Sequence, residues 1–350
     1  MSIQPEYRRL GTSGLRVSVP ILGTMGLGDL EWNNWVLPED KSIALLKAAW
    51  DAGITTLDTA NMYSNGVSEQ IIGNFLKQYE IPREGIIIIT KLRFFVDHEQ
   101  MSNITAKPTM RPGMANLRDY VNQGGLSRAA IFNQAQASLR RLQTDYVDIL
   151  MIHMSDLATP FEETMCALND LVRSGKARYL GASNVRAWHL IEMNNIAERN
   201  GWTKFSCIQV EHSLLYRAEE LELIAYCHYK GIGVTAYAPL MDGHLARPIG
   251  TETTRSKKYS SIKAEKPRRE SDLQIIKRVQ ELSMKKSWKM SQVALAWLLS
   301  KNSIPIVGAN SVDRLHESVV AGKILTDEEI KYLEELHVFF ARVLHRNVAD

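Results

Sequence analysis

The chain has 350 residues, of which 45% are hydrophobic and 23% charged, as in ordinary globular proteins. Its formal net charge of +3 is too small and too dispersed to indicate a nucleic-acid partner, and its three widely spaced cysteines indicate neither a disulfide framework nor a metal site. Because Met1 to Leu10 is polar and no apolar stretch is long enough to cross a membrane, we expect a cytosolic protein.

Short apolar runs rich in β-branched residues alternate along the chain with longer amphipathic segments. The runs predict eight strands, at residues 21–25, 55–58, 86–90, 147–152, 177–181, 207–210, 234–236 and 304–307. Runs that are apolar at almost every position are typical of parallel strands, because such strands are buried on both faces.

The amphipathic segments predict helices at residues 38–52, 67–79, 127–142, 160–174, 185–200, 218–230, 271–286, 291–300, 312–321 and 326–337. Ser127 is a suitable N-cap for the third of these, and Thr326 with Glu329 predicts a capping box at the start of the last. Before the first strand, residues 7–17 place glycines and a serine between short apolar pieces, which predicts a hairpin that closes the bottom of a barrel.

Eight strand–helix repeats predict an α/β fold whose strands close into a (β/α)8 barrel, the TIM barrel. We expect one domain over residues 1–350, with its core at about residues 7–337. The alternative, a doubly wound open sheet, is disfavoured because no GxGxxG pattern follows the first strand. Long connections follow the third and seventh strands, at residues 92–125 and 241–270, and loops of this length are usually functional lids or disordered.

Polar side chains follow three successive predicted strands. Asp58 ends the second strand with Tyr63 shortly after it, Lys91 ends the third and His153 follows the fourth. Since the carboxyl ends of barrel strands meet at one face, we expect these four groups to lie together there. Taken singly, each also suits a structural role, as a helix cap, a packed aromatic, a solvated strand end or a core histidine. Four such groups at neighbouring strand ends favour a catalytic site.

The four groups suit the reduction of a carbonyl. Hydride attack on the carbon builds negative charge on oxygen, which needs a proton from a positioned acid. Tyr63 is a poor acid by itself, and a nearby Lys91 ammonium is expected to lower its pKa. Asp58 is the expected partner of a buried Lys91, and His153 is placed to orient the substrate oxygen.

These residues resemble the Asp-Tyr-Lys-His tetrad of the aldo-keto reductase superfamily. The likeness runs in order from Tyr7 to about Leu336. Three further stretches, at residues 35–39, 63–69 and 125–128, resemble a fungal branch of versiconal hemiacetal acetate reductase-like and aryl-alcohol dehydrogenase-like enzymes.

The resemblance implies where a nicotinamide cofactor binds. Ser183, Asn184 and Gln209 would hold the nicotinamide carboxamide, and their side chains are suited to an amide. Tyr237 would stack under the nicotinamide ring, although a packed aromatic is the plainer interpretation. The residues that follow Tyr237 are implied cofactor contacts as well, and they are Ala238, Pro239 and Leu240.

The segment after the eighth strand resembles the family's site for an adenosine 2′-phosphate, which implies NADPH. Gly308 allows close approach of the backbone, Asn310 stands where several relatives carry a basic residue, and Arg314 would hold the phosphate. Glu317 and Ser318 occupy positions that contact adenine in relatives, with Ser318 in place of a frequent asparagine. The cations of the 241–270 loop predict either a solvated loop or a lid over the pyrophosphate.

Apolar side chains just past the strand ends would form a pocket for a bulky or aromatic carbonyl, and each of them also suits loop packing. They are Met25, Trp32, Trp35, Phe94, Phe95 and Met154. We therefore expect a monomeric carbonyl reductase acting on a small molecule, as in fungal secondary metabolism. A regulatory or redox-sensing NADPH-binding subunit on the same fold is the alternative. An isomerase barrel should show a carboxylate base or a metal cluster at the strand ends, and the sequence shows no set of His and carboxylate ligands there.

Overall fold

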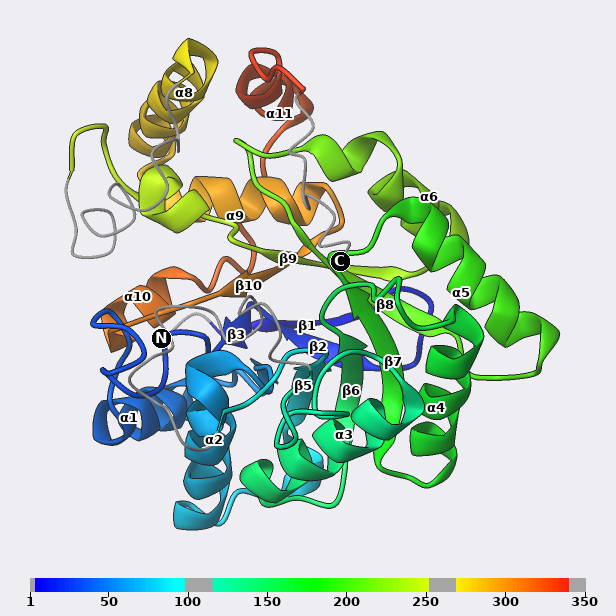
Figure 1. Ribbon diagram of the computed structural model, residues 1–350. Coiled ribbons are helices and arrows are strands. Elements are labelled where there is room, and N and C mark those ends of the chain that lie inside the picture. The colour runs from blue at the N-terminus through cyan, green and yellow to red at the C-terminus, as the bar shows by residue number, and fades with distance from the viewer. Residues whose placement is uncertain (1–3, 98–115, 252–268, 340–350) are drawn as a thin grey trace.

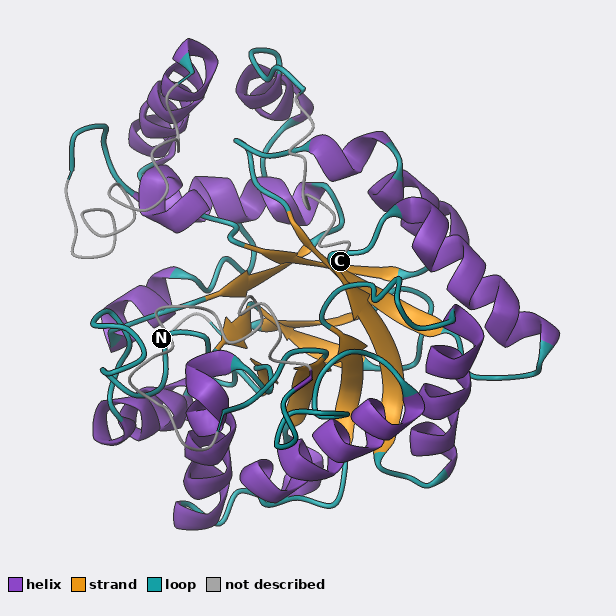
Figure 2. Cartoon of the chain, viewed as in Figure 1, coloured by secondary structure: helices purple, strands orange, loops and turns teal. Residues whose placement is uncertain are grey.

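The structure is a computed structural model that describes residues 4–97, 116–251 and 269–339. Eight parallel strands close into a barrel in the order β10-β3-β4-β5-β6-β7-β8-β9, and helices surround it (Figure 1 and Figure 2). The predicted (β/α)8 barrel is confirmed. That residues 1–350 form a single domain stays a prediction.

All eight predicted strands are present, with ends that move by a few residues. The strands are β3 (Ile21–Gly23), β4 (Thr56–Asp58), β5 (Ile87–Leu92), β6 (Val147–Ile152), β7 (Ala177–Ser183), β8 (Phe205–Glu211), β9 (Gly233–Tyr237) and β10 (Ile304–Val307). Strands β7 and β8 run further than predicted, because polar residues at their carboxyl ends remain hydrogen-bonded to neighbouring strands.

The helices follow the predicted order around the barrel. They are α1 (Glu39–Asp51), α2 (Val67–Gln78), α3 (Arg128–Leu142), α4 (Phe161–Arg173), α5 (Ala187–Arg199), α6 (Leu223–Lys230), α8 (Glu270–Lys286), α9 (Met290–Ser300), α10 (Val312–Glu317) and α11 (Asp327–Glu334). The predicted cap at Ser127 and the capping box at Thr326 and Glu329 are both confirmed.

Two predicted helices were wrong in extent. The segment 218–230 begins with a separate 3-10 turn, Ala218–Leu221, before α6. The helix expected at 312–321 ends at Glu317, because Val319 and Val320 leave it to become buried in two different apolar clusters. In a continuing helix with a 3.6-residue period, buried residues recur on one face, whereas these two consecutive residues are buried against different clusters.

The N-terminal hairpin is confirmed as β1 (Glu6–Arg9) paired antiparallel with β2 (Arg16–Val19). Leu10, in its turn, is fully buried and belongs to the apolar cluster that fills the barrel interior. A Cβ added to Gly233, at the start of β9, would lie 2.7 Å from the Leu10 side chain. The hairpin therefore closes the amino-terminal end of the barrel.

Side chains alternate between the two faces of each barrel strand. On β5, Ile89 packs with the interior cluster, whereas Ile88 and Leu92 pack with the helical layer. The same alternation aims Lys91 into the barrel. Within the described residues, no helix is long and apolar enough to span a membrane.

Candidate active site

The barrel register brings the four predicted catalytic residues to one end of adjacent strands. Asp58 is the last residue of β4, and Lys91 lies near the end of the neighbouring β5. On the next strand, the backbone N–H of His153 donates to the carbonyl of Leu92 at 2.8 Å. Tyr63 begins the short 3-10 turn Tyr63–Gly66 that follows β4. The structure therefore places all four side chains at the carboxyl-terminal end of the barrel.

Lys91 and Asp58 form an ion pair that is almost completely buried. Lys91 Nζ donates to Asp58 Oδ1 at 2.7 Å and to the carbonyl of Thr59 at 2.8 Å, and the two charged side chains are 0% and 3% exposed. Burial alone would lower the pKa of Lys91, but the Asp58 carboxylate raises it above its ordinary value. The predicted partnership is present, and Lys91 is a fixed cation.

The phenol of Tyr63 lies against this cation, with 3.4 Å between Lys91 Nζ and Tyr63 Oη. Burial raises the pKa of Tyr63, Lys91 opposes that rise, and Asp58 adds to it. Lys91 acts on the pKa of Tyr63 in the expected direction, but burial outweighs the ammonium and the net shift is upward. A phenol with a raised pKa stays protonated at neutral pH, which is the state that a proton donor needs.

His153 faces Tyr63 edge-on, with 6.0 Å between ring centroids and 83° between ring planes. Burial, together with the charges of Lys91 and Arg93, holds the pKa of His153 well below its ordinary value. The imidazole is therefore neutral and carries one N–H donor and one acceptor nitrogen. Its buried Nδ1 has no hydrogen-bond partner among the described residues.

A strained turn positions Tyr63. The next residues, Ser64 and Asn65, have φ values of 47° and 55°, in the left-handed region that costs about 1 kcal/mol or more per residue. Both side chains fasten the turn to neighbouring loops. Ser64 Oγ accepts from the backbone N–H of Asp29 at 2.7 Å, and the Asn65 amide bonds both backbone polar groups of Asp97. Sequence reasoning placed Tyr63 but missed these two anchors.

The residues implied to hold a nicotinamide lie on the adjoining strands. Ser183 on β7 pairs in register with Gln209 on β8. Asn184 donates its Nδ2 to Ser183 Oγ at 3.0 Å and to the carbonyl of His153 at 3.1 Å, while its Oδ1 accepts from the hydroxyl of Tyr237 at 2.8 Å. One hydrogen-bonded chain thus links the predicted stacking aromatic to the backbone of the predicted catalytic histidine.

Gln209 has a second contact that sequence reasoning missed. Its Nε2 donates to Asp58 Oδ2 at 2.7 Å, so one carboxylate fixes both Lys91 and Gln209. No short-range signal reveals this pair, because the two residues lie 151 positions apart. Among the described residues, Gln209 Oε1 and the hydroxyl hydrogen of Ser183 have no partner, which leaves an acceptor and a donor for an amide. The polar groups present therefore fit a nicotinamide carboxamide.

The charges of two arginines act on each other near the segment after β10. Arg247, which follows the 3-10 turn Met241–Ala246, has its pKa lowered by burial and by the charge of Arg314. Arg314 Nη1 donates to Asn310 Oδ1 at 2.8 Å, so Asn310 orients the guanidinium. Two like charges that act on each other in this way favour the binding of an anion. Ser318 is buried and donates its hydroxyl to the carbonyl of Leu315 at 2.6 Å.

For some of the residues that the resemblance implies as cofactor contacts, the structure shows only a backbone feature that suits the role. Gly308 is exposed, and a Cβ added to it would have no neighbour nearer than 4.0 Å. Ala238 has a φ of 51°, which turns the chain sharply after Tyr237. Pro239 and Leu240 have apolar side chains, and the Glu317 side chain makes no hydrogen bond to another described residue. Most cations of the 241–270 loop, like residues 98–115 of the 92–125 loop, lie outside the described residues.

The predicted apolar pocket residues separate into groups. Trp32 and Trp35 pack together, 5.9 Å between ring centroids, in a cluster with Met25. The Phe94 ring lies 5.0 Å from the His153 ring and so reaches the tetrad. Phe95 packs instead against Tyr120, 6.1 Å between centroids, inside its own loop.

Met154 is half-buried beside His153. Of the predicted pocket residues, Phe94 thus has a ring contact with the tetrad, and Met154 adjoins it in the chain.

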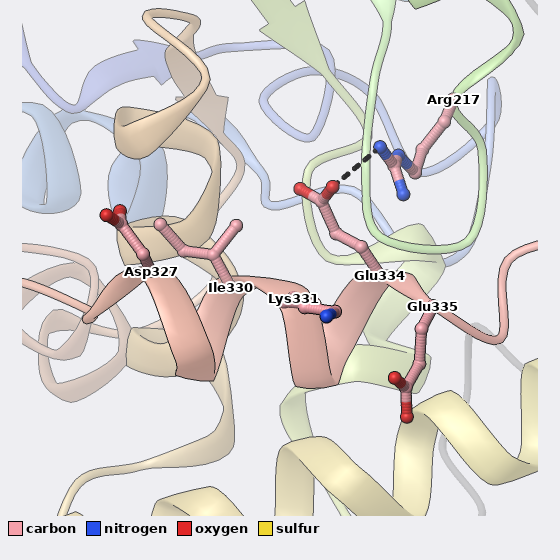
Figure 3. Close-up of a pocket in the computed structure, with 6 residues that line it drawn as sticks. All are labelled: Arg217, Asp327, Ile330, Lys331, Glu334 and Glu335. Atoms are coloured by element: carbon pink, nitrogen blue, oxygen red, sulfur yellow. Dashed lines mark hydrogen bonds and ion pairs between the residues drawn. The ribbon is translucent and has the colours of Figure 1, made fainter.

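A cavity of about 400 Å³ lies elsewhere, beside α11 (Figure 3). Its lining residues are Arg217, Asp327, Ile330, Lys331, Glu334 and Glu335. Arg217 and Glu334 point toward each other and form a 3.0 Å ion pair. None of the predicted site residues lines this cavity. Within the described residues, no group of His, Cys, Asp and Glu side chains gathers as metal ligands.

Comparison with known proteins agrees with this geometry. The sequence profile of the Aldo/keto reductase family matches residues 21–338. The chain belongs to the aldo/keto reductase family. It is 48% identical to the versiconal hemiacetal acetate reductase of Aspergillus parasiticus over 338 residues, which are 95% of this chain and 97% of that protein.

Two further fungal relatives cover the chain to the same extent. An aldo-keto reductase of Alternaria alternata is 46% identical over 342 residues, 95% of this chain and 91% of its own length. A Schizosaccharomyces pombe protein whose name describes a putative aryl-alcohol dehydrogenase is 44% identical over 347 residues, 95% and 96% of the two chains. This aldo/keto reductase is therefore an oxidoreductase that uses a nicotinamide cofactor for carbonyl reduction of small molecules.

Proposed function

We propose that this aldo/keto reductase reduces an aldehyde or ketone with NADPH, and that Tyr63 donates the proton to the carbonyl oxygen. The observation that carries the proposal is the hydroxyl of Tyr63 held 3.4 Å from a buried Lys91 ammonium, which Asp58 fixes in place. A nicotinamide cofactor supplies the hydride when it is bound. The residues of the chain supply the proton and the electrostatic setting.

The proton moves from Tyr63 Oη to the substrate oxygen as negative charge develops there. The phenolate that remains is stabilised by the Lys91 ammonium, whose own charge Asp58 maintains. Neutral His153 donates an N–H to the same oxygen and orients the carbonyl without competing for the proton. Groups held by the barrel need little rearrangement during the reaction, and this preorganisation favours the transition state.

The nicotinamide carboxamide would be held by Ser183, Asn184 and Gln209, with Tyr237 against the ring. Three observations support this. Among the described residues, the Ser183 hydroxyl donates no hydrogen bond and Gln209 Oε1 accepts none. A hydrogen bond also fixes Tyr237 to Asn184. NADPH, rather than NADH, is favoured by the two arginines at positions 247 and 314. Their mutual repulsion is relieved by an anion, and a 2′-phosphate supplies one.

The substrate is a bulky or aromatic carbonyl compound of the kind made in fungal secondary metabolism. Phe94 beside His153 supplies an aromatic wall for it, and two relatives are named for a hemiacetal acetate and for aryl alcohols. The protein would act as a cytosolic monomer that needs no partner protein.

The decisive test is Tyr63→Phe. Binding of NADPH and NADH is titrated by cofactor fluorescence, and reduction of benzaldehyde is followed by NADPH absorbance. The variant should bind NADPH as the wild type does and lose reduction by roughly 100-fold or more, because it lacks the general acid. Wild-type turnover in the variant would refute the role of Tyr63. A wild type that binds neither nucleotide would refute the cofactor site.

A further inference from the structure

Arg93 lies at the carboxyl-terminal end of the barrel, two residues after Lys91. It follows β5, on which Lys91 points inward and Leu92 points toward the helices. The backbone N–H of His153 donates to the carbonyl of Leu92, so Arg93 and His153 are neighbours across two strands. The charge of Arg93 acts on His153, and its guanidinium lies against the Phe94 ring that also contacts His153, so the Arg93 side chain lies on the tetrad side of the strand end.

The guanidinium of Arg93 is only partly used by the protein. Its Nε donates to the carbonyl of Ser155 at 3.1 Å, and its Nη groups donate to no other described residue. Asp156, the carboxylate whose charge acts on Arg93, forms no ion pair with it. Asp156 Oδ2 instead accepts from the backbone N–H of Leu126 at 2.8 Å. A guanidinium has five N–H donors, so most of those of Arg93 are left for a ligand.

The backbone of Arg93 is strained. Its φ is 148°, a value that glycine adopts freely and other residues rarely do. Two hydrogen bonds hold the residue in this conformation: its N–H donates to Gln134 Oε1 at 2.8 Å, and its carbonyl accepts from the N–H of Gly125 at 2.7 Å. Glycine would suit this backbone better, so the arginine side chain contributes something other than stability.

We propose that Arg93 binds a carboxylate carried by the carbonyl substrate. A carboxylate matches the planar fork of a guanidinium with two parallel hydrogen bonds. The Phe94 ring lies 5.2 Å from the guanidinium carbon and 5.0 Å from the His153 ring. It offers an apolar wall for the ring or chain that separates the carboxylate from the reacting carbonyl. This inference rests on the proposed carbonyl reductase function and names its substrate class: an oxo acid, such as an aromatic aldehyde with a ring carboxylate.

Pairs of substrates that differ only in the negative charge of the carboxylate test the proposal. The 3- and 4-carboxybenzaldehydes are compared with their methyl esters, with NADPH as the reductant. The wild type should show the higher kcat/KM for at least one acid over its ester. Arg93→Met should reduce kcat/KM for that acid by roughly 10- to 100-fold more than it reduces kcat/KM for the ester, because a hydrogen-bonded charge is lost. Arg93→Lys should be intermediate, since it keeps the charge but not the fork.

Arg186→Met is the matched control. Arg186 is exposed, precedes α5 at the same end of the barrel, and loses the same charge when substituted. It should keep the preference for the acid over the ester. If Arg186→Met lowers the preference as much as Arg93→Met, the effect comes from the general field of the surface, and the Arg93 site is refuted.

Binding without turnover separates this inference from the proposed function. Calorimetric titration with benzoate and with benzamide should show an affinity for benzoate that Arg93→Met loses. Arg93→Gly should lose it as well, yet unfold at a higher urea concentration than the wild type, because glycine removes the strain. A wild type that reduces the esters and shows no acid preference refutes the Arg93 site alone. Benzoate binding that depends on Arg93, in a protein that reduces no aldehyde, refutes the reductase function and supports the anion site.

Discussion

Asp58→Asn tests whether Lys91 depends on its buried partner. The substitution keeps the size of the side chain and removes its charge. The new amide can still accept from Lys91 through its one oxygen, and Gln209 can turn its own amide to present Oε1 in place of Nε2. The hydrogen bonds are therefore largely replaceable. What is lost is the negative charge beside an ammonium that is 0% exposed.

The expected cost is about 3–5 kcal/mol in the free energy of unfolding, the usual effect of leaving a buried charge unpaired. The double variant Asp58→Asn with Lys91→Met removes the unpaired charge as well. It should regain most of that loss, because neutral replacements of buried ion pairs are often tolerated. The raised pKa of Lys91 sets the pH window. The contribution of the pair is complete below the unfolded pKa near 10.5 and is lost as the pH rises through the higher folded value, so measurement at pH 7 captures all of it.

Urea unfolding, followed by circular dichroism and by tryptophan fluorescence, measures both variants against the wild type. The Lys91→Met single variant is measured too, because it completes the double-mutant cycle. The reasoning fails if Asp58→Asn costs less than about 1 kcal/mol. It also fails if the double variant is no more stable than Asp58→Asn, since the loss would then come from packing around Asp58 and not from an orphaned ammonium.

Two further predictions concern pH and cofactor choice. The raised pKa of Tyr63 keeps the phenol protonated, and the lowered pKa of His153 keeps the imidazole neutral. We therefore expect kcat for benzaldehyde reduction to be flat from about pH 7 to 9 and to fall only at more alkaline pH. A steep decline of kcat centred between about pH 7 and 9 would contradict the assignment of Tyr63 as the acid. Arg314→Leu should weaken NADPH binding by about tenfold and leave NADH binding unchanged, because one exposed charge-assisted contact to phosphate is lost. Fluorescence titration with both nucleotides measures this, and an equal loss for NADH would show that Arg314 does not contact the 2′-phosphate.

The barrel and the tetrad were predictable because their signals are local. Buried parallel strands read as apolar runs, and a polar residue that ends such a run stands out. Asp58, Lys91 and His153 each end or follow a strand in this way, and the register of a closed barrel then brings them together. The placement of Tyr63 depended on its nearness to Asp58 in the sequence.

Contacts between distant segments were not predictable in the same way. The bond from Gln209 to Asp58 joins strands on opposite sides of the barrel order, and the charge of Arg314 in α10 acts on Arg247 in the loop after β9. The pKa of Tyr63 shows the same limit. A neighbouring ammonium is visible in the sequence, but the desolvation that outweighs it depends on how completely the surrounding loops cover the phenol.

Backbone strain near the tetrad could not be predicted from the sequence either. A sequence gives no φ values, so the left-handed residues Ser64 and Asn65 and the unusual backbone of Arg93 emerge only in the fold. All three flank the tetrad and none is a glycine, which would adopt these conformations at lower cost. Each is held there by hydrogen bonds to a neighbouring loop or helix. The large apolar core of the barrel can stabilise a site built this way, and the position of the strain marks Arg93, along with the tetrad, as a part of the molecule selected for binding and chemistry instead of stability.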